Sequence, residues 1–465
     1  MQVATLTTAR SAAAVLAVTL ICAGPAQAVP RSAAAAPARY EAESATIVRG
    51  AAESDHSGYS GTGFATVTSP LAAGRNTNRL TSTTADGVPD LDYIDVTVTA
   101  PDTTPPTAPG TPSISGPTAH GVTLEWGAAT DDTAVTADGG APSKITTFST
   151  GWTIPWGIHW MPDNKTALVT ERDSFKVFEV TPDGARTQIG TVPNAVTTGG
   201  EGGLLGVAVD PEWSTNHFVY FMHTASEGNR VARMTYAGGA LTGYKVLLRG
   251  IKKNKYHNGG RLAFGPDGYL YASTGEAQDR DLAQDKDSLN GKILRMTRDG
   301  GAAPGNPFGT YVYSYGHRNP QGLAFDRDGR LWEAEFGDSS KDELNLIQPG
   351  RNYGWPICEG ECSTAGMTNP KKTWKVSEAS PSGIAIVRNV IYMAALRGER
   401  LWRVPIDGDT GNLGTPTAYY VGSYGRLRTV TTVPGRDELW LSTTNCDNNG
   451  KEPAGADKLL RVSIT

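Results

Sequence analysis

Residues 261–274 read RLAFGPDGYLYAST, a short apolar stretch, a Pro-Asp-Gly turn and an alternating apolar stretch. This order is typical of a β-hairpin whose strands are half-buried. The pattern occurs six times, as GIHWMPDNKTALVT (157–170), GVAVDPEWSTNHFVYF (206–221), RLAFGPDGYLYAST (261–274), GLAFDRDGRLWEAE (322–335), GIAIVRNVIYMAAL (383–396) and TVTTVPGRDELWLST (429–443). The copies start 46 to 61 residues apart, so each interval has room for two more strands.

Six such units within residues 145–465 predict an all-β fold, a six-bladed β-propeller of four-stranded blades. A closed ring of blades protects the strand edges that a single sheet would expose. A large β-sandwich is the alternative, but it does not require such regular recurrence.

In a propeller the innermost strands all run the same way along the central channel. If the first strand of each hairpin is innermost, the residues just before it converge at one end of the channel. Residues just after the second strand return to that end. The first group is Trp156, Glu201, His257, Asn258, His317, Arg318, Asn319, Ser380, Pro381, Ser382, Arg426 and Arg428, and the second includes Glu276, Gly337, Asp338, Arg397 and Asn445.

Four of these converging side chains are arginines, Arg318, Arg397, Arg426 and Arg428. Guanidinium groups pair bidentately with carboxylates, so the cluster predicts a pocket for a compact polyanion. Each arginine taken alone could equally be a solvated loop charge.

Two histidines reach the same end. A neutral imidazole can accept a proton near pH 7, which makes His257 a candidate general base. A structural histidine bonded to the loop is the alternative for His257. It is the favoured reading for His317, because the neighbouring Arg318 disfavours a charged imidazole.

The stretch FGDSSKDELNLIQPGRNYGWP (336–356) combines carboxylates with Gly turns. Carboxylate and backbone oxygens suit a hard cation such as calcium, with Asp338, Asp342 and Glu343 as candidates. A solvated turn would look similar.

The 465 residues carry a formal charge of −5, which argues against nucleic acid as the main partner. Residues 1–28 resemble an export signal, with one charge at Arg10, an apolar core and the small residues Ala26 and Ala28. A membrane anchor is the alternative, although the apolar run is shorter than a span requires. We therefore expect a secreted, extracellular protein with no membrane span.

Of the four cysteines, Cys22 would leave with the signal. Cys358 and Cys362 are close enough for a small-loop disulfide in an oxidising compartment, although two free thiols would also fit. Cys446 would then remain unpaired.

Between the signal and the repeats, residues 29–38 form a low-complexity linker. Residues 39–100 resemble parts of a jelly-roll carbohydrate-binding module, with Glu41, Glu43 and Asp92 where such modules hold calcium. Residues 101–144 combine a Pro/Thr-rich spacer with a stretch that resembles the start of a fibronectin type III domain. Both segments are too short to be complete, so we expect partial β-sandwich-like segments that bind a polysaccharide or serve only as a tether.

The repeat region also resembles the soluble quinoprotein sugar dehydrogenases, the glucose/sorbosone dehydrogenase family. Five motifs carry the resemblance in order, EGGLLGVAVDP, HNGGRLAFGPDG, LNGKILRM, YGHRNPQGLAF and DELNLIQPGRNYGWP. The resemblance implies a six-bladed propeller that binds pyrroloquinoline quinone (PQQ) and calcium.

Position by position, the resemblance implies that His257 is the general base and that Arg318 and Asn319 contact the quinone. It further implies that Arg426 and Arg428 clamp the PQQ carboxylates. Arg397 stands where the family commonly has lysine, and Glu201 where the glucose enzymes have glutamine. For metals, it implies that the carbonyls of Gly337 and Asp338 hold the cofactor's calcium, and that Glu343 and Tyr353 hold a second, structural calcium.

The implied reaction oxidises the C1 hydroxyl of an aldose to the lactone, with a hydride passing to the quinone and later to an external electron acceptor. His257 would take the hydroxyl proton, and Arg318 would stabilise charge on the reduced cofactor. A calcium-dependent lactonase is a rival, disfavoured because the ring offers arginines more than carboxylates. A sugar-binding propeller without catalysis is the other rival.

Overall fold

The computed structural model describes residues 139–407 and 411–465 in full and, within residues 1–138, only the backbone of eight strands. The chain divides into two compact units, Met1–Asp138 and Gly139–Thr465. No helix among the described residues is long and apolar enough to cross a membrane.

The first unit contains two four-stranded sheets, with strand orders β5-β1-β8-β7 and β3-β4-β2-β6. The predicted signal, linker and module-like segments, with Glu41 and Glu43, fall largely outside the described residues, and of Asp92 only the backbone is described. These assignments therefore stay predictions. The strands are β1 (Val3–Thr8), β2 (Ala14–Ala23), β3 (Gly50–Glu53), β4 (Phe64–Leu71), β5 (Asn76–Thr81), β6 (Asp90–Thr99), β7 (Ser113–Thr118) and β8 (Gly121–Glu125).

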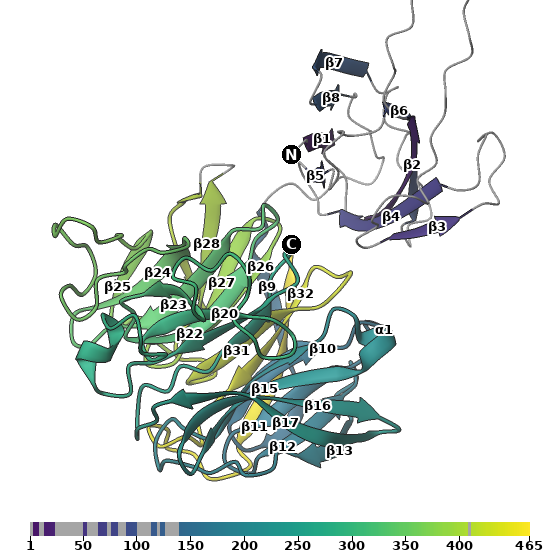
Figure 1. Ribbon diagram of the computed structural model, residues 1–465. Helices are drawn as coiled ribbons and strands as arrows, with labels where there is room; N and C mark the ends of the chain where they lie inside the picture. The colour runs from purple at the N-terminus through teal and green to yellow at the C-terminus, as the bar shows by residue number, and fades with distance from the viewer. Residues whose placement is uncertain are drawn as a thin grey trace, which may run out of the picture. The chain divides into compact units, whose positions relative to one another are not determined.

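The second unit is the predicted six-bladed propeller (Figure 1). Blade 1 contains β10 (Pro155–Trp160), β11 (Ala167–Glu171), β12 (Lys176–Val180) and β13 (Arg186–Thr191). Blade 2 contains β14 (Leu204–Val209), β15 (Phe218–Ala225), β16 (Gly228–Ala237) and β17 (Ala240–Ile251). Blade 3 contains β18 (Leu262–Phe264), β19 (Leu270–Thr274), β20 (Lys292–Met296) and β21 (Val312–Tyr315).

Blade 4 contains β22 (Asn319–Phe325), β23 (Leu331–Phe336), β24 (Lys341–Ile347) and β25 (Lys372–Lys375). Blade 5 contains β26 (Pro381–Val387), β27 (Val390–Ala395), β28 (Arg400–Asp407), β29 (Asn412–Leu413) and β30 (Thr417–Tyr419). Blade 6 contains β31 (Leu427–Thr432), β32 (Glu438–Thr443), β33 (Asp457–Ile464) and β9 (Pro142–Trp152). The short helices are α1 (Trp213–Asn216) and the 3-10 helix η2 (Arg280–Ala283).

Each predicted hairpin forms the two inner strands of one blade, and its first strand is the innermost one. The innermost strands contact one another around the ring in the order β10, β14, β18, β22, β26, β31 and back to β10. The prediction that one end of the channel collects residues from all six blades therefore has the geometry it requires.

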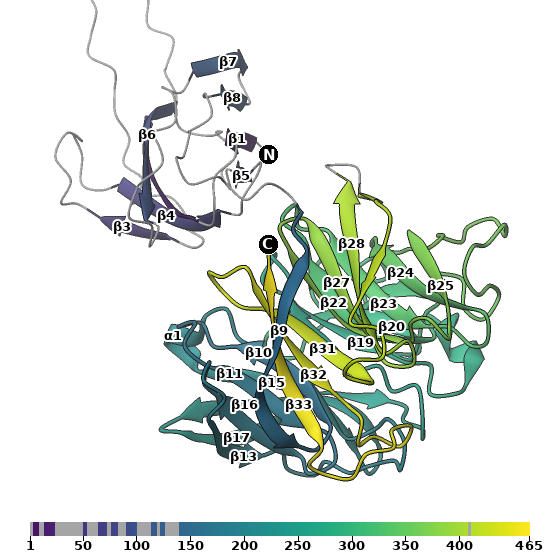
Figure 2. The ribbon, with the colours of Figure 1, turned by 180° about the vertical axis from the view of Figure 1, so that it is seen from behind.

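The ring is closed by strands from the two ends of the propeller. β9 pairs with β33 in antiparallel register, so that Leu460 lies opposite Thr147 (Figure 2). β9 begins slightly before the boundary predicted at residue 145. The buried carboxylate of Asp457 reinforces the junction, because it accepts hydrogen bonds from the backbone N–H groups of Ile154 (2.9 Å) and Asn445 (2.5 Å).

Among the described residues, the hydrophobic core of the propeller consists of six clusters, each packed mainly between two neighbouring blades. Between blades 6 and 1, for example, the rings of Trp160 and Trp440 lie 4.4 Å apart, and Phe148 contacts the same indole. Burial of such large apolar side chains stabilises the contact between blades, since it removes apolar surface from water. The rigid ring in turn fixes the loops at the ends of the channel.

Candidate active site

Glu201 joins three blades at the end of the channel where the inner strands begin. Its Oε2 atom accepts hydrogen bonds from the backbone N–H of His257 and from Nδ2 of Asn319, both at 3.0 Å. His257 has φ +58°, an uncommon left-handed conformation for a residue other than glycine. The loop before β18 is therefore held in a special geometry that brings three of the predicted residues together.

The imidazole of His257 is oriented by Glu276, which follows β19. Nδ1 of His257 lies 2.7 Å from Oε1 of Glu276, a carboxylate that is only 1% exposed. A carboxylate at Nδ1 fixes the proton on that nitrogen and leaves the lone pair on Nε2. His257 can therefore act as a base through Nε2. The sequence placed Glu276 at this end of the channel but indicated no role for it.

His317 has the structural position expected of it. It is fully buried, its Nδ1 lies 2.9 Å from Oε1 of Glu335 and its Nε2 lies 2.9 Å from Oγ of Ser314. Its ring also stacks on Tyr353 at 4.8 Å. With both nitrogens occupied inside the protein, His317 positions the chain rather than facing the channel.

Arg318 is held by the loop that follows β23. Its Nη1 donates to the carbonyl of Gly337 (2.6 Å) and its Nη2 to Oδ1 of Asp338 (2.8 Å). Its guanidinium also lies 5.2 Å from the ring of Trp355, close enough for a cation–π contact. Nε of Arg318 is buried without a hydrogen-bond partner among the described residues. The guanidinium is thus positioned but not fully satisfied.

Arg426 and Arg428 share one carboxylate. Both donate to Oδ2 of Asp447 at 3.1 Å. Burial alone would raise the pKa of Asp447, but Arg428 and Arg426 lower it, so the carboxylate stays charged. Burial lowers the pKa of Arg428 to about 10, which leaves it cationic at neutral pH. Asp447 was missed in the sequence, because nothing in the loop around Cys446 indicated which side chain faces the arginines.

Arg397 follows β27 and is exposed. Within the described part of the chain it forms no hydrogen bond and no ion pair. The structure therefore does not bring it into contact with the other predicted residues, although it leaves its guanidinium free.

Glu359 fills a ring of backbone donors beside Arg318. Its Oε1 accepts hydrogen bonds from four consecutive N–H groups, those of Asp338, Ser339, Ser340 and Lys341, at 2.7–3.0 Å. Burial opposes the charge, but these donors lower the pKa of Glu359 to about 2. The carboxylate therefore fixes the loop that presents Gly337 and Asp338.

Glu359 lies within the small loop closed by the predicted disulfide, which the structure contains between Cys358 and Cys362. Cys446 is the free cysteine of the described region. It is half-buried, and burial is the main cause that raises its pKa to about 11, so its thiol is not reactive at neutral pH.

The acidic loop does not form a single metal site. Adjacent residues of a strand point to opposite faces, so Asp342 and Glu343 diverge on β24. Asp342 accepts hydrogen bonds from the N–H groups of Gly337 (2.9 Å) and Ser380 (2.5 Å), while Asp338 pairs with Arg318 and Arg280. The grouping of Asp338, Asp342 and Glu343 suggested by composition is therefore wrong.

Glu343 instead belongs to a buried carboxylate cluster. Glu335 lies opposite Glu343 in the β23–β24 register, and Glu333 lies opposite Asn345. Nδ2 of Asn345 donates to Glu333 (3.0 Å), Glu335 (3.2 Å) and Glu343 (3.2 Å). Tyr353 lies nearby, stacked on His317.

The electrostatics of this carboxylate cluster are unfavourable without a cation. Burial, followed by the charge of Glu335, raises the pKa of Glu333 well above its usual range and that of Glu343 to about 8. Oε1 of Glu333 and Oδ1 of Asn345 are buried without hydrogen-bond partners among the described residues. Several hard oxygens with unused lone pairs fit a calcium ion.

The described part of the second unit is thus a six-bladed propeller with a histidine–carboxylate pair and a set of arginines at one end of its channel. This places it in the general class of propellers whose axial site suits an anionic ligand. Residues 152–452 match the glucose/sorbosone dehydrogenase family profile. The chain belongs to the glucose/sorbosone dehydrogenase family.

Individual proteins agree with this assignment. Quinoprotein glucose dehydrogenase B of Acinetobacter calcoaceticus is 34% identical over 46% of this chain, which spans about half (52%) of that protein. Aldose sugar dehydrogenase YliI of Escherichia coli is 30% identical over 55% of this chain and 78% of its own length. The PQQ-bound aldose sugar dehydrogenase structure from Streptomyces coelicolor matches with 47% identity and a TM-score of 0.68, covering 70% of this chain and 99% of that one.

Proposed function

We propose that the protein is a PQQ- and calcium-dependent sugar dehydrogenase that oxidises the C1 hydroxyl of an aldose to the lactone. The observation that carries the proposal is the His257–Glu276 pair beside a set of arginines at one end of the channel. The N–H of Glu276 donates to the carbonyl of Arg318 (2.9 Å), and Arg426 and Arg428 lie at the start of the innermost strand β31. Membership of the family and the similarity to a PQQ-bound aldose sugar dehydrogenase support it.

The residues at this end fit PQQ, which carries three carboxylates. Arg426 and Arg428 share the single carboxylate of Asp447, and Arg397 has no carboxylate partner among the described residues. The buried Nε atoms of Arg318 and Arg428 lack hydrogen-bond acceptors in the described region. This excess of unsatisfied cationic donors suits a polyanion. Arg318, Arg397, Arg426 and Arg428 would hold the cofactor together with Asn319 and Glu201.

Calcium is proposed at two places. Beside the cofactor, the carbonyl oxygens of Gly337 and Asp338 would supply ligands, in a loop already fixed by Glu359. Away from the channel, Glu343 and Tyr353 would hold a structural ion together with the unpaired oxygens of Glu333 and Asn345. The hydroxyl of Tyr353 already donates to the carbonyl of Leu346 and accepts from the N–H of Gln348, so its backbone carbonyl would be the ligand. Both donor sets consist of hard oxygens, as calcium prefers.

When bound, PQQ supplies the two-electron acceptor for the hydride from C1, with calcium as a Lewis acid beside it. His257 removes the proton of the C1 hydroxyl through Nε2. Glu276 stabilises the imidazolium that results, since its buried charge lies 2.7 Å from Nδ1. Arg318 stabilises negative charge that develops at the cofactor.

Glu201 would also accept a hydrogen bond from the sugar substrate. Its Oε2 already accepts two hydrogen bonds, which leaves Oε1 as an acceptor for a sugar hydroxyl. The carboxylates at the channel, including Glu276 and Asp447, are committed to His257 and to the arginines. This arrangement does not favour the lactonase alternative, which requires carboxylates that hold a central metal.

The cellular setting is part of the proposal. An export signal at residues 1–28 would make the enzyme secreted, where it would pass electrons to an external acceptor. The module-like segments ahead of the propeller would allow contact with a polysaccharide.

The decisive experiment adds PQQ and calcium to the purified apo-protein and measures dye reduction with a panel of aldoses. His257→Gln should abolish reduction while leaving PQQ binding, measured by absorbance titration, nearly unchanged. His217→Gln, at an exposed position beside α1, is the matched control. PQQ binding without turnover of any sugar would point to a binding protein, and full activity of His257→Gln would exclude His257 as the base.

A further inference from the structure

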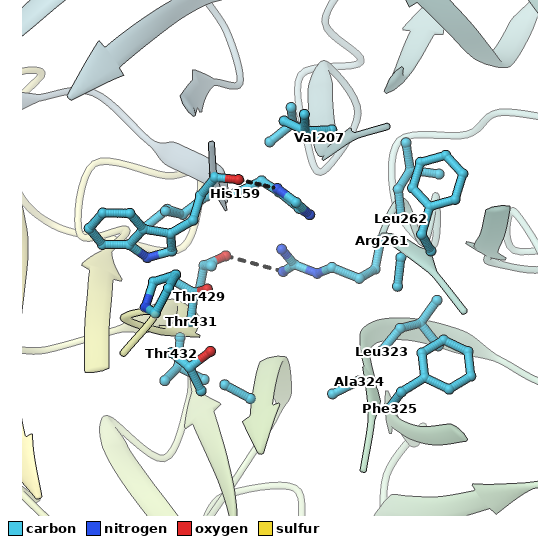
Figure 3. Close-up of a pocket in the computed structure, with 18 of the residues that line it drawn as sticks. His159, Val207, Arg261, Leu262, Leu323, Ala324, Phe325, Thr429, Thr431 and Thr432 are labelled. Carbon is cyan, nitrogen blue, oxygen red and sulfur yellow. Dashed lines mark hydrogen bonds between the residues drawn. The ribbon is translucent and has the colours of Figure 1, made fainter. Parts of the chain in front are cut away.

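A cavity of about 510 Å³ occupies the other end of the central channel. It is lined by the ends of the innermost strands of all six blades, with residues such as His159, Val207 and Phe325 (Figure 3). We name it the exit chamber. None of the residues assigned to the sugar and cofactor site lines it.

A layer of hydrogen-bonded side chains lies between the exit chamber and the candidate active site. Oε1 of Gln321 accepts hydrogen bonds from Arg428 (3.1 Å) and from Ser382 (2.9 Å). The backbone carbonyl of Gln321 accepts one from Nε of Arg261 (2.8 Å), and Nη2 of Arg261 donates to Thr429 (3.2 Å). The layer therefore contains two guanidinium groups, one belonging to each end of the channel.

The charges of these two guanidinium groups are compensated unequally. Arg428 pairs with Asp447 on the active-site side. Arg261 is 8% exposed and donates only to neutral oxygens, with no ion pair to any carboxylate of the described residues. Burial and the nearby Arg428 lower the pKa of Arg261 to about 9, so it remains a cation at neutral pH. A buried cation without a counter-ion is costly, and an anion that reaches it gains correspondingly.

The guanidinium of Arg261 faces the exit chamber. Figure 3 shows its side chain extended from just before β18 across the cavity toward Thr429. The guanidinium carbon also lies 4.3 Å from the ring centre of Trp156, which is not drawn in the figure. Nη1 of Arg261 forms no hydrogen bond with the described residues. One strong donor is thus available to a ligand in the chamber.

No other charged group competes for this position. Asp210 lines the chamber, but its carboxylate is held by the hydroxyl of Tyr220 (2.8 Å) and by Arg298 (3.6 Å). His159 bonds the carbonyl of Trp160 through Nδ1, and burial lowers its pKa, so it is neutral. Among the residues that line the chamber, Arg261 is therefore the one whose charge has no counter-ion.

We propose that the exit chamber binds a small organic carboxylate whose charged group pairs with Arg261. The volume falls within the range of small-molecule sites. Apolar side chains and threonine hydroxyls around the cavity suit a compact, amphipathic body. This site is independent of the proposed sugar oxidation.

Isothermal titration of the full-length protein, loaded with PQQ and calcium, with benzoate tests the proposal, and benzyl alcohol is the uncharged analogue. Benzoate should bind with one-to-one stoichiometry and benzyl alcohol at least roughly tenfold more weakly, because it lacks the charge-assisted pair. Arg261→Gln should weaken benzoate by at least about tenfold, while Arg261→Lys should retain most of the affinity.

Two further variants separate this site from the arginines of the other end. Thr431→Phe fills the chamber at a half-buried position without removing a hydrogen-bond partner of Arg261, and should reduce benzoate binding even if Arg261→Gln does not fold. Arg426→Gln should leave benzoate binding unchanged, whether or not the protein binds PQQ. The proposal would be overturned if benzoate did not bind the wild type, or if benzyl alcohol bound as tightly as benzoate. It would also be overturned if Thr431→Phe bound benzoate fully or if Arg426→Gln lost benzoate binding.

Discussion

Nδ1 of His257 and Oε1 of Glu276 lie 2.7 Å apart, and this distance defines which nitrogen of the imidazole can work as a base. The carboxylate is almost completely buried, whereas the imidazole is 15% exposed toward the channel. The second carboxylate oxygen of Glu276, Oε2, has no hydrogen-bond partner among the described residues, so the charge of Glu276 acts mainly on His257.

Glu276→Gln should therefore lower kcat for the aldose by about 100-fold, because it removes the charge that stabilises the imidazolium. The acid limb of the pH profile of kcat should also move to lower pH, because the imidazolium of His257 is then stabilised less, and a merely structural role would not cause this shift. Glu276→Asp should retain part of the activity. Unchanged kcat and pH profile in Glu276→Gln would remove Glu276 from the proposed proton transfer.

The four backbone N–H groups that donate to Glu359 connect the disulfide loop to the loop that presents Gly337 and Asp338. We therefore expect Glu359 to influence cofactor binding. Glu359→Gln should lower the free energy of unfolding by about 1–3 kcal/mol, since a charged acceptor of four N–H groups is lost. The concentration of calcium needed for half-maximal PQQ binding should rise, because the loop that presents Gly337 is no longer fixed. Absorbance titration measures this shift.

Glu361→Gln is the matched control, since Glu361 is exposed in the same disulfide loop. It should leave both stability and the calcium requirement unchanged. Equal behaviour of the two variants would show that the loop carbonyls do not depend on Glu359.

The buried carboxylate cluster predicts an unusual pH dependence of the metal-free protein. Glu343 has a pKa raised to about 8, so the folded state binds more protons than the unfolded state above pH 4.5. Stability in the presence of EDTA should therefore fall as the pH rises from 5 to 8. Calcium should restore the melting temperature at pH 8 and have a smaller effect at pH 5, which thermal denaturation would show.

Glu333→Gln sharpens this test. It removes one negative charge from the cluster, so the metal-free variant should melt higher than the wild type at pH 8. Its additional stabilisation by calcium should be smaller than that of the wild type. A melting temperature that does not depend on pH in EDTA would contradict the proposed cation site.

We expect the loss of the Arg397 guanidinium to weaken PQQ binding without changing the stability of the fold. Because it is exposed and makes no contact within the described residues, Arg397→Gln should change the free energy of unfolding by less than about 0.5 kcal/mol. PQQ binding should weaken by about 3- to 10-fold if the guanidinium pairs with a cofactor carboxylate at the partly exposed mouth. Arg436→Gln, at another exposed arginine, should leave PQQ binding unchanged, and an equal loss in both variants would contradict a specific contact.

The fold could be predicted because the hairpin pattern repeats six times, and a closed ring gives every copy a neighbouring blade on both sides. The position of His257, Glu201 and Asn319 at one end followed from their places before the innermost strands. The carboxylate cluster could not be predicted, because the register that sets Glu335 opposite Glu343 depends on three-dimensional pairing. Asp447 and Glu359 were missed for a similar reason, since their partners come from distant loops or from backbone N–H groups.

The junction of β9 with β33 has a consequence for how the chain matures. Ile154 and Asp457, which meet there, are 303 residues apart. During synthesis the early strand emerges from the ribosome long before its partner exists, so five blades accumulate with an open seam. Nascent chains should be most vulnerable to proteases and to aggregation in this interval, which ends when β33 has been made and pairs with β9.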